Sequence, residues 1–289
     1  MNYKKASENI RQELRNYIIG KNLKSLVMGI SGGVDSALCA ALAKPICDEL
    51  NIPLIGRSLP TTTNTGGENS RAQEIGKQFC TDFKEVEIQD GFTAMYDLAV
   101  TNFDLLGIDA TKESILKGNI KARTRMILLY DIAGATNGLV LSTDNWTEYL
   151  LGFWTLHGDV GDYGMIQELW KTEVYEMSEW LVKNELFFNE DKANALNACI
   201  EATATDGLGI TNSDLEQIMP DFVGSSRDGY AEVDEILINT RKHSIRLHKL
   251  FISNTIDNSK TSKNIVRNRW LKSEFKRNNP FNLKRKDIT

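Results

Sequence analysis

The chain has 289 residues, of which 41% are hydrophobic and 25% are charged, and its formal net charge is −5. These values are ordinary for a globular domain and exclude a disordered tail protein, a collagen-like repeat and a small disulfide scaffold. No apolar run reaches the roughly 18 residues that a membrane span needs, and the polar N-terminus lacks the apolar core of a signal peptide. The sequence therefore predicts a soluble cytoplasmic protein without a membrane partner.

Charge is unevenly distributed along the chain. Residues 241–289 carry 14 basic and 3 acidic side chains, whereas the remaining residues carry 20 and 36. Such asymmetry can indicate a nucleic acid, an anionic small molecule or an acidic subunit as partner. Because the basic segment lacks repeated Arg-Gly or aromatic–basic motifs, we expect no nucleic acid.

Strand and helix patterns alternate over the first half of the chain. Helices are expected at 3–20, 37–50, 71–80, 92–105 and 112–135. Buried or alternating strands are expected at 26–30, 52–59, 83–88 and 138–142. This order predicts an α/β fold with a parallel sheet flanked by helices on both faces. Ligands bind at the carboxyl ends of such strands, so the loops after 26–30 and 138–142 are the expected site.

The second half of the chain is mainly helical after residue 165, which predicts a helical C-terminal part. Residues 203–229 interrupt this pattern with many Gly, Ser, Thr and Asp. A loop of that length is usually a functional lid or disordered.

The hexapeptide Ser31-Gly32-Gly33-Val34-Asp35-Ser36 lies between a predicted strand and a predicted helix. Its glycines permit a sharp turn with amide groups aimed at one point, and the helix start adds a positive dipole end. The loop lacks the G-K-[ST] ending of a Walker A loop and the G-x-G-x-x-G pattern of a dinucleotide fold. A carboxylate inside an anion site predicts an accompanying Mg²⁺.

This hexapeptide resembles the pyrophosphate loop, S-G-G-x-D-S, of the N-type ATP pyrophosphatases. The resemblance implies the adenine nucleotide alpha hydrolase-like fold and the cleavage of ATP to AMP and pyrophosphate, with an acceptor oxygen adenylated. The superfamily includes NAD, GMP, asparagine and argininosuccinate synthetases and several tRNA-modifying enzymes.

Further segments resemble the ammonia-dependent NAD synthetase family in order and spacing. The resemblance rests on Asn119-Ile120-Lys121-Ala122-Arg123-Thr124-Arg125-Met126, on Leu141-Ser142-Thr143-Asp144 with Glu148, on Gly152-Phe153, on Gly158-Asp159-Val160-Gly161-Asp162, on Ala204-Thr205-Asp206-Gly207-Leu208 and on Glu274-Phe275-Lys276-Arg277-Asn278-Asn279-Pro280. It covers about 30–280 and implies one synthetase domain over 1–289.

The resemblance also implies a role for particular residues. It assigns ATP contacts to Gly29, Ile30, Ser31, Gly32, Gly33, Val34, Asp35, Ser36, Thr143, Lys171 and Thr205. It assigns contacts with the acceptor to Arg123, Asp162, Phe275 and Lys276, and catalytic roles to Asp35 and Lys171. Because Asp35 and Glu148 follow adjacent predicted strands, these two carboxylates are expected to share the Mg²⁺.

The implied reaction is the amidation of deamido-NAD to NAD with ammonia, through an acyl-adenylate, with release of AMP and pyrophosphate. The resemblance further implies a homodimer, and a chain of this length has no room for a glutaminase domain beside the synthetase. One departure bears on the acceptor, because Leu156 stands where the family has a lysine. The same chemistry on nicotinate mononucleotide therefore remains an alternative, as does an RNA-modifying pyrophosphatase.

Overall fold

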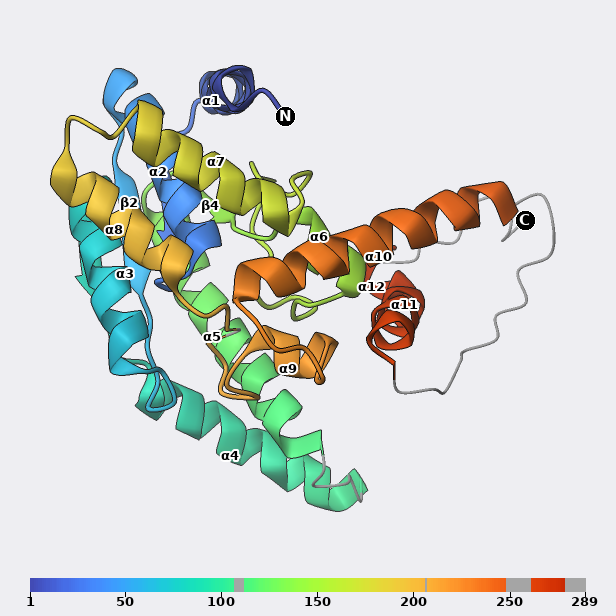
Figure 1. Cartoon of the computed structure of the whole chain (residues 1–289). Coiled ribbons are helices and arrows are strands. Elements are labelled where there is room, and N and C mark those ends of the chain that lie inside the picture. Colours follow the sequence, from blue (N-terminus) through green and yellow to red (C-terminus); the bar gives the residue numbers. More distant parts are fainter. Residues whose placement is uncertain (107–111, 206, 248–260, 279–289) are drawn as a thin grey trace, which may run out of the picture.

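The computed structural model describes residues 1–106, 112–205, 207–247 and 261–278 (Figure 1). Its centre is a five-stranded, all-parallel sheet with the strand order β3-β2-β1-β4-β5. The strands are β1 (Ser25–Gly29), β2 (Leu54–Ser58), β3 (Asp82–Glu85), β4 (Gly138–Ser142) and β5 (Tyr163–Gly164). The order reverses at β1, so that β1 pairs with β2 on one side and with β4 on the other. This reversal leaves a crevice beyond the carboxyl ends of β1 and β4.

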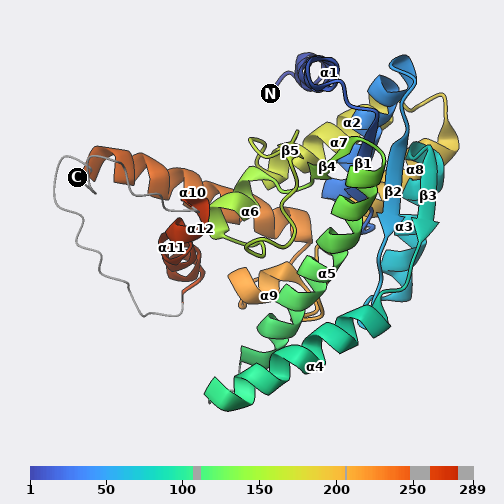
Figure 2. The ribbon, with the colours of Figure 1, turned by 180° about the vertical axis from the view of Figure 1, so that it is seen from behind.

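Helices cover both faces of the sheet, as the sequence predicts (Figures 1 and 2). The helices of the first 201 residues are α1 (Tyr3–Lys21), α2 (Val34–Glu49), α3 (Gly66–Phe79), α4 (Gln89–Leu106), α5 (Glu113–Ala135), α6 (Trp146–Leu151), α7 (Lys171–Asn184) and α8 (Glu190–Glu201). Alternate strand residues separate the two layers. Leu26 and Met28 of β1 pack with α2, whereas Val27 packs with Leu129 and Ala133 of α5.

The last helices form a second, smaller hydrophobic core. They are α9 (Asp214–Ile218), α10 (Ser226–Leu247), α11 (Ser262–Lys272) and α12 (Glu274–Arg277). Leu215, Tyr230 and Val266 from three of these helices are buried together with Leu150 and Leu151 of α6. Because α6 follows β4, this second core is attached to the carboxyl edge of the sheet.

The expected order of strands and helices is confirmed, with two differences. The two-residue strand β5 has no sequence signal, because it is too short for a pattern to form. The interval 203–229, expected to be a loop, contains α9 and the start of α10, which are held by the buried apolar side chains Leu215 and Ile218. Within the described ranges, none of the helices is long and apolar enough to cross a membrane.

Candidate active site

The Ser31–Ser36 loop joins β1 to α2 at the point where the strand order reverses. Gly32 has φ 79°, and a Cβ there would lie 2.4 Å from the Glu68 carbonyl oxygen, so only glycine fits. The hydroxyls of Ser31 and Ser36 lie 3.1 Å apart, and the Gly33 amide donates to Ser31 Oγ over 3.2 Å. These contacts fix a tight turn whose polar groups crowd around the start of α2.

The N-terminus of α2 is available to an anion. Gly33 is its N-cap, and among the described residues no side chain accepts a hydrogen bond from the first turn as a cap. The unpaired amides of a helix start carry a partial positive charge and bind phosphate groups. Asp35, the acidic residue of this turn, instead accepts hydrogen bonds from Asn145 and Lys171.

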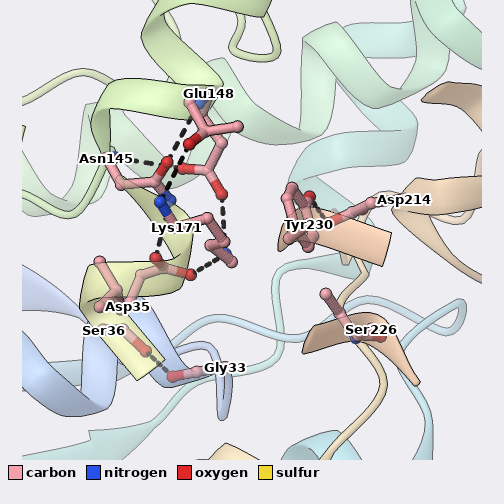
Figure 3. Close-up of polar contacts among 12 residues, drawn as sticks. Gly33, Asp35, Ser36, Asn145, Glu148, Lys171, Asp214, Ser226 and Tyr230 are labelled. Carbon is pink, nitrogen blue, oxygen red and sulfur yellow. Dashed lines mark hydrogen bonds and ion pairs between the residues drawn. The ribbon is translucent and has the colours of Figure 1, made fainter. Parts of the chain in front are cut away.

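A buried lysine joins the two loops that the sequence singled out. Lys171 is the first residue of α7, and its side chain is only 3% exposed. Its ammonium forms an ion pair with Asp35 and a second with Glu148 at 2.9 Å (Figure 3). The side-chain amide of Asn145 donates to the other carboxylate oxygen of Asp35 over 2.9 Å. The carboxylates of Asp35 and Glu148 are therefore within reach of one cation.

Local sequence explains how Glu148 reaches this position. The Asn145 side chain caps α6 by accepting from the Glu148 backbone amide, and the Glu148 carboxylate accepts from the Asn145 backbone amide in a capping box. Asp234 of α10, which is buried, accepts hydrogen bonds from the Thr147 hydroxyl and from the amide and hydroxyl of Thr172. One carboxylate thus fixes the residues that adjoin Glu148 and Lys171.

The electrostatics of the cluster follow from burial and pairing. Burial raises the pKa of the Glu148 carboxyl to about 7, although the ammonium of Lys171 opposes this shift. Burial would lower the pKa of Lys171, but Asp35 and Glu148 hold it well above its usual value. The lysine is therefore charged, as a neighbour of transferring phosphate groups needs to be.

A cavity of about 340 Å³ opens beside this cluster. Ten of the residues expected to contact ATP line it: Gly29, Ile30, Ser31, Gly33, Val34, Asp35, Ser36, Thr143, Lys171 and Thr205. Gly32, the eleventh, shapes the turn instead. Thr205 donates its hydroxyl to Glu68 over 2.5 Å, so α3 holds the segment after α8 against the cavity.

The residues expected to contact the acceptor are not gathered in the same way. Lys276 lines the cavity, donating to the Gly152 carbonyl over 2.8 Å and to the Trp154 carbonyl. Arg123 donates to the Leu156 carbonyl, Asp162 accepts from Tyr130 and the Val140 amide, and Phe275 is 63% exposed. None of these last three is among the described residues that line the cavity.

Two residues of the site, Arg125 and Asn145, have no role assigned from the sequence. Arg125 lines the cavity and donates to Asn64 and to the Gly207 carbonyl over 3.2 Å each, and Asn145 binds Asp35. Arg125 belongs to the segment 119–126, and Asn145 lies between Asp144 and Glu148 of another segment, so their place in these segments is the available signal. Asp206, Asn279 and Pro280, which two further segments include, lie outside the described residues.

The donor set fits the implied Mg²⁺. Asp35 and Glu148 supply carboxylate oxygens, the hard ligands that this ion prefers, and both already face one positive charge. In the described part of the chain no group of three or more His, Cys, Asp or Glu converges on a metal position. A Mg²⁺ bound by few carboxylates commonly completes its shell with water and substrate phosphate oxygens.

Comparisons with known proteins agree with this geometry. The family model for NAD synthase matches residues 6–280. The NH(3)-dependent NAD(+) synthetase of Thermoplasma acidophilum is 32% identical over 249 residues, which are 86% of this chain and 95% of that protein. The NH(3)-dependent NAD(+) synthetase of Vibrio campbellii is 35% identical over 214 residues, 68% of this chain and 75% of that one.

Two solved structures share the fold over nearly the whole chain. The NMN synthetase from Francisella tularensis superposes with a TM-score of 0.73 at 22% identity and covers 98% of both chains. The NH3-dependent NAD synthetase from Campylobacter jejuni, in complex with the nitrate ion, gives 0.68 at 24% identity over 98% of this chain and 100% of that one. At these identities the likeness concerns the fold alone.

Proposed function

The chain belongs to the NAD synthase family, and on that premise we propose that it amidates deamido-NAD to NAD with ammonia, at the expense of ATP. The enzyme is a carbon–nitrogen ligase that forms AMP and pyrophosphate. The observation that carries the proposal is the junction of the Ser31–Ser36 loop with the cluster of Asp35, Glu148 and Lys171. This junction places anion-binding amides, two carboxylates and a buried ammonium at one end of one cavity.

The two chemical steps follow from this arrangement. The acceptor carboxylate attacks the α-phosphorus of ATP, the bond to the pyrophosphate oxygen breaks, and pyrophosphate leaves toward the amides of the Ser31–Ser36 loop. Ammonia then attacks the acyl carbon, AMP departs with the bonding electron pair, and the surplus proton goes to solvent. The Lys171 ammonium stabilises the developing negative charge, and no side chain acts as a nucleophile.

We further propose that Asp35 and Glu148 hold the Mg²⁺ that accompanies ATP. When bound, the ion neutralises charge on the phosphate oxygens. The support is that both carboxylates form ion pairs with the ammonium of Lys171. Positive charge is therefore stabilised between them. The backbone amides in the first turn of α2 and the hydroxyls of Ser31 and Ser36 would orient the phosphates on the other side.

A homodimer would complete the acceptor end of the site. Ile127, Leu128 and Tyr130 are 59%, 36% and 41% exposed along one stretch of α5, and Tyr130 donates to Asp162. Exposed apolar side chains on adjacent turns are typical of a protein interface. A second copy on α5 would bring protein atoms beside Arg123 and Asp162, both assigned to the acceptor. Analytical ultracentrifugation tests this, since Tyr130→Arg is expected to give the monomer.

The same reaction on nicotinate mononucleotide is the second candidate. Its support is Leu156, an apolar side chain in place of the lysine that the family has there. Without this lysine, the site lacks one cation that could bind an anionic group of the acceptor. The dinucleotide, which is the larger acceptor, would lose more from its absence than the mononucleotide.

A direct assay decides between the candidates. Purified protein is incubated with MgATP, ammonia and either deamido-NAD or nicotinate mononucleotide, and AMP and amide are quantified by chromatography. Equal amounts of NAD and AMP from the dinucleotide establish the main proposal, and turnover of the mononucleotide alone moves the acceptor. Absence of AMP in both reactions refutes the proposal.

A further inference from the structure

One face of α5 lies against the loop formed by residues 207–210, between α8 and α9. Gly118, Lys121 and Arg125 are spaced by three and four residues, so they share one side of the helix. Each of the three contacts the 207–210 loop. The loop in turn lines the cavity, through Gly207, Leu208 and Ile210. This face of α5 therefore sets the position of one wall of the active site.

Gly118 permits close approach of the loop. A Cβ at this position would lie 3.2 Å from both Leu208 Cβ and Ile210 Cδ1, which is tighter than an ordinary contact. The loop also lies close to Thr63. Gly209 has φ 75°, and a Cβ there would lie 2.9 Å from Thr63 Cβ. Glycines on both surfaces allow the loop to rest directly on the helix and on residue 63.

Lys121 provides the strongest polar contact with the loop. It is 4% exposed, and its ammonium donates to the Leu208 carbonyl over 2.9 Å and to the Thr63 hydroxyl over 2.8 Å. Its Nζ also lies 5.2 Å from the centre of the Phe92 ring. Burying an ammonium is costly unless it is hydrogen-bonded, and charge-assisted hydrogen bonds are strong. Displacing the loop would thus remove a partner from a buried charge.

Arg125 binds the preceding carbonyl, that of Gly207, one turn further along α5. Two successive backbone carbonyls of the loop are therefore held by two cations on one helix face. Bonds to backbone carbonyls do not depend on the side chains of the loop. These two bonds therefore set the position of the loop backbone.

We propose that Lys121 is a positioning residue that holds the 207–210 loop closed over the acyl-adenylate and so excludes water from it. The inference rests on the proposed function for the identity of the intermediate. Lys121 acts through the loop, because its ammonium is engaged by Leu208 and Thr63 and does not line the cavity within the described residues.

The consequence is a partition between two reactions of one intermediate. Ammonia attack on the acyl carbon breaks its bond to AMP and gives the amide, AMP and a proton. Water attack on the same carbon breaks the same bond and returns the carboxylate with AMP and two protons. A loosened loop admits water, so ATP is consumed without amidation.

The principal experiment compares Lys121→Met with Lys117→Met in the full-length protein. Lys117 lies one turn earlier on α5, where it forms an exposed ion pair with Glu113, so its substitution removes a charge from the same helix but leaves the loop untouched. At limiting ammonia, Lys121→Met is expected to raise the AMP-to-amide ratio several-fold, whereas Lys117→Met keeps the wild-type ratio. A purely structural role would lower the amount of active enzyme and leave this ratio unchanged.

Limited proteolysis measures the loop without reference to the reaction. Cleavage within 202–213, located by mass spectrometry, is expected to be several-fold faster in Lys121→Met than in Lys117→Met or the wild type. If wild-type protein forms no AMP, the proposed function fails, yet this measurement still decides whether Lys121 holds the loop. Unchanged cleavage together with an unchanged ratio overturns the inference.

Gly118→Ala keeps the test decisive if Lys121→Met does not fold. The added methyl group meets Leu208 and Ile210, while alanine favours the helix. The expected result is a higher AMP-to-amide ratio in a protein whose helix is intrinsically more stable. A wild-type ratio in Gly118→Ala would contradict the docking of the loop on this face.

Discussion

The two ends of the cavity are built differently. At the phosphate end, Lys171 is almost fully buried, its partners Asp35 and Glu148 are 16% and 15% exposed, and the three are already joined by ion pairs. Of the residues assigned to the acceptor, Arg123 and Phe275 are exposed and Asp162 is engaged by Tyr130, and these three are not among the described residues that line the cavity. The residues assigned to ATP are gathered in one place, whereas of the residues assigned to the acceptor only Lys276 lines the cavity within the described part of the chain. Substitutions at the phosphate end should therefore abolish chemistry, and those at the acceptor end should change affinity.

Asp35→Asn is expected to have the largest effect. It removes a charge that pairs with Lys171 and is proposed to bind Mg²⁺, so AMP formation should fall by about 10³-fold. The measurement is AMP release at saturating ATP and ammonia. Asp48→Asn is the matched control, since Asp48 lies on the same helix but is exposed and pairs only with Lys44 among the contacts described. Retention of more than a tenth of the activity in Asp35→Asn would contradict the assignment.

Lys171→Met tests whether the cluster is preassembled. Two buried carboxylates would lose their shared cation, which should cost about 3–5 kcal/mol in the free energy of unfolding. Added Mg²⁺ should restore more of the melting temperature in this variant than in the wild type, because the ion replaces the lost charge. Thermal denaturation with and without Mg²⁺ gives the answer. Equal Mg²⁺ effects in the two proteins would separate the cation site from Asp35 and Glu148.

Arg123→Ala examines the acceptor end, where a smaller and different effect is expected. Loss of a guanidinium contact should raise the KM for the acceptor about tenfold and leave kcat and the KM for ATP near their wild-type values. Steady-state kinetics with each substrate varied separately make the distinction. Arg15→Ala, which removes an exposed guanidinium from α1, serves as the control. A fall in kcat alone would place Arg123 with the phosphate chemistry instead.

Sequence patterns brought the residues assigned to ATP to one cavity, and this has a physical reason. The turn at Gly32 and the buried strand at Ser25–Gly29 are set by residues that lie close together in the sequence. Such local constraints leave a readable pattern.

The supporting contacts depend instead on distant partners. Lys121 and Leu208 are 87 residues apart in sequence, as are Thr147 and Asp234. In the sequence, the buried Lys121 cannot be distinguished from the exposed Lys117 on the same helix. Only the folded chain shows which lysine has a distant partner. The assignments of Arg123, Asp162 and Phe275 rest on resemblance and stay predictions.

Asp159 offers the smallest effect and a test of the region between the two ends. Burial raises the pKa of its carboxyl from 3.8 to about 6, although hydrogen bonds from backbone amides, including that of Thr155, oppose the shift. The folded protein therefore keeps this proton at pH values where the unfolded chain has lost it. Folding takes up a proton between about pH 4 and 6, so this group makes the free energy of unfolding fall as pH rises through that window.

Asp159→Asn should remove this contribution, because an amide oxygen can still accept from the Thr155 amide but does not titrate. Chemical denaturation at pH 4 to 7 is expected to show that the variant gains stability relative to the wild type as pH rises, with the difference constant above about pH 6. A difference that is flat across the whole range would mean that the Asp159 carboxylate is as well solvated as in the unfolded chain. In that case the cavity wall at Asp159 is open to water, and the buried part of the site would not include this residue.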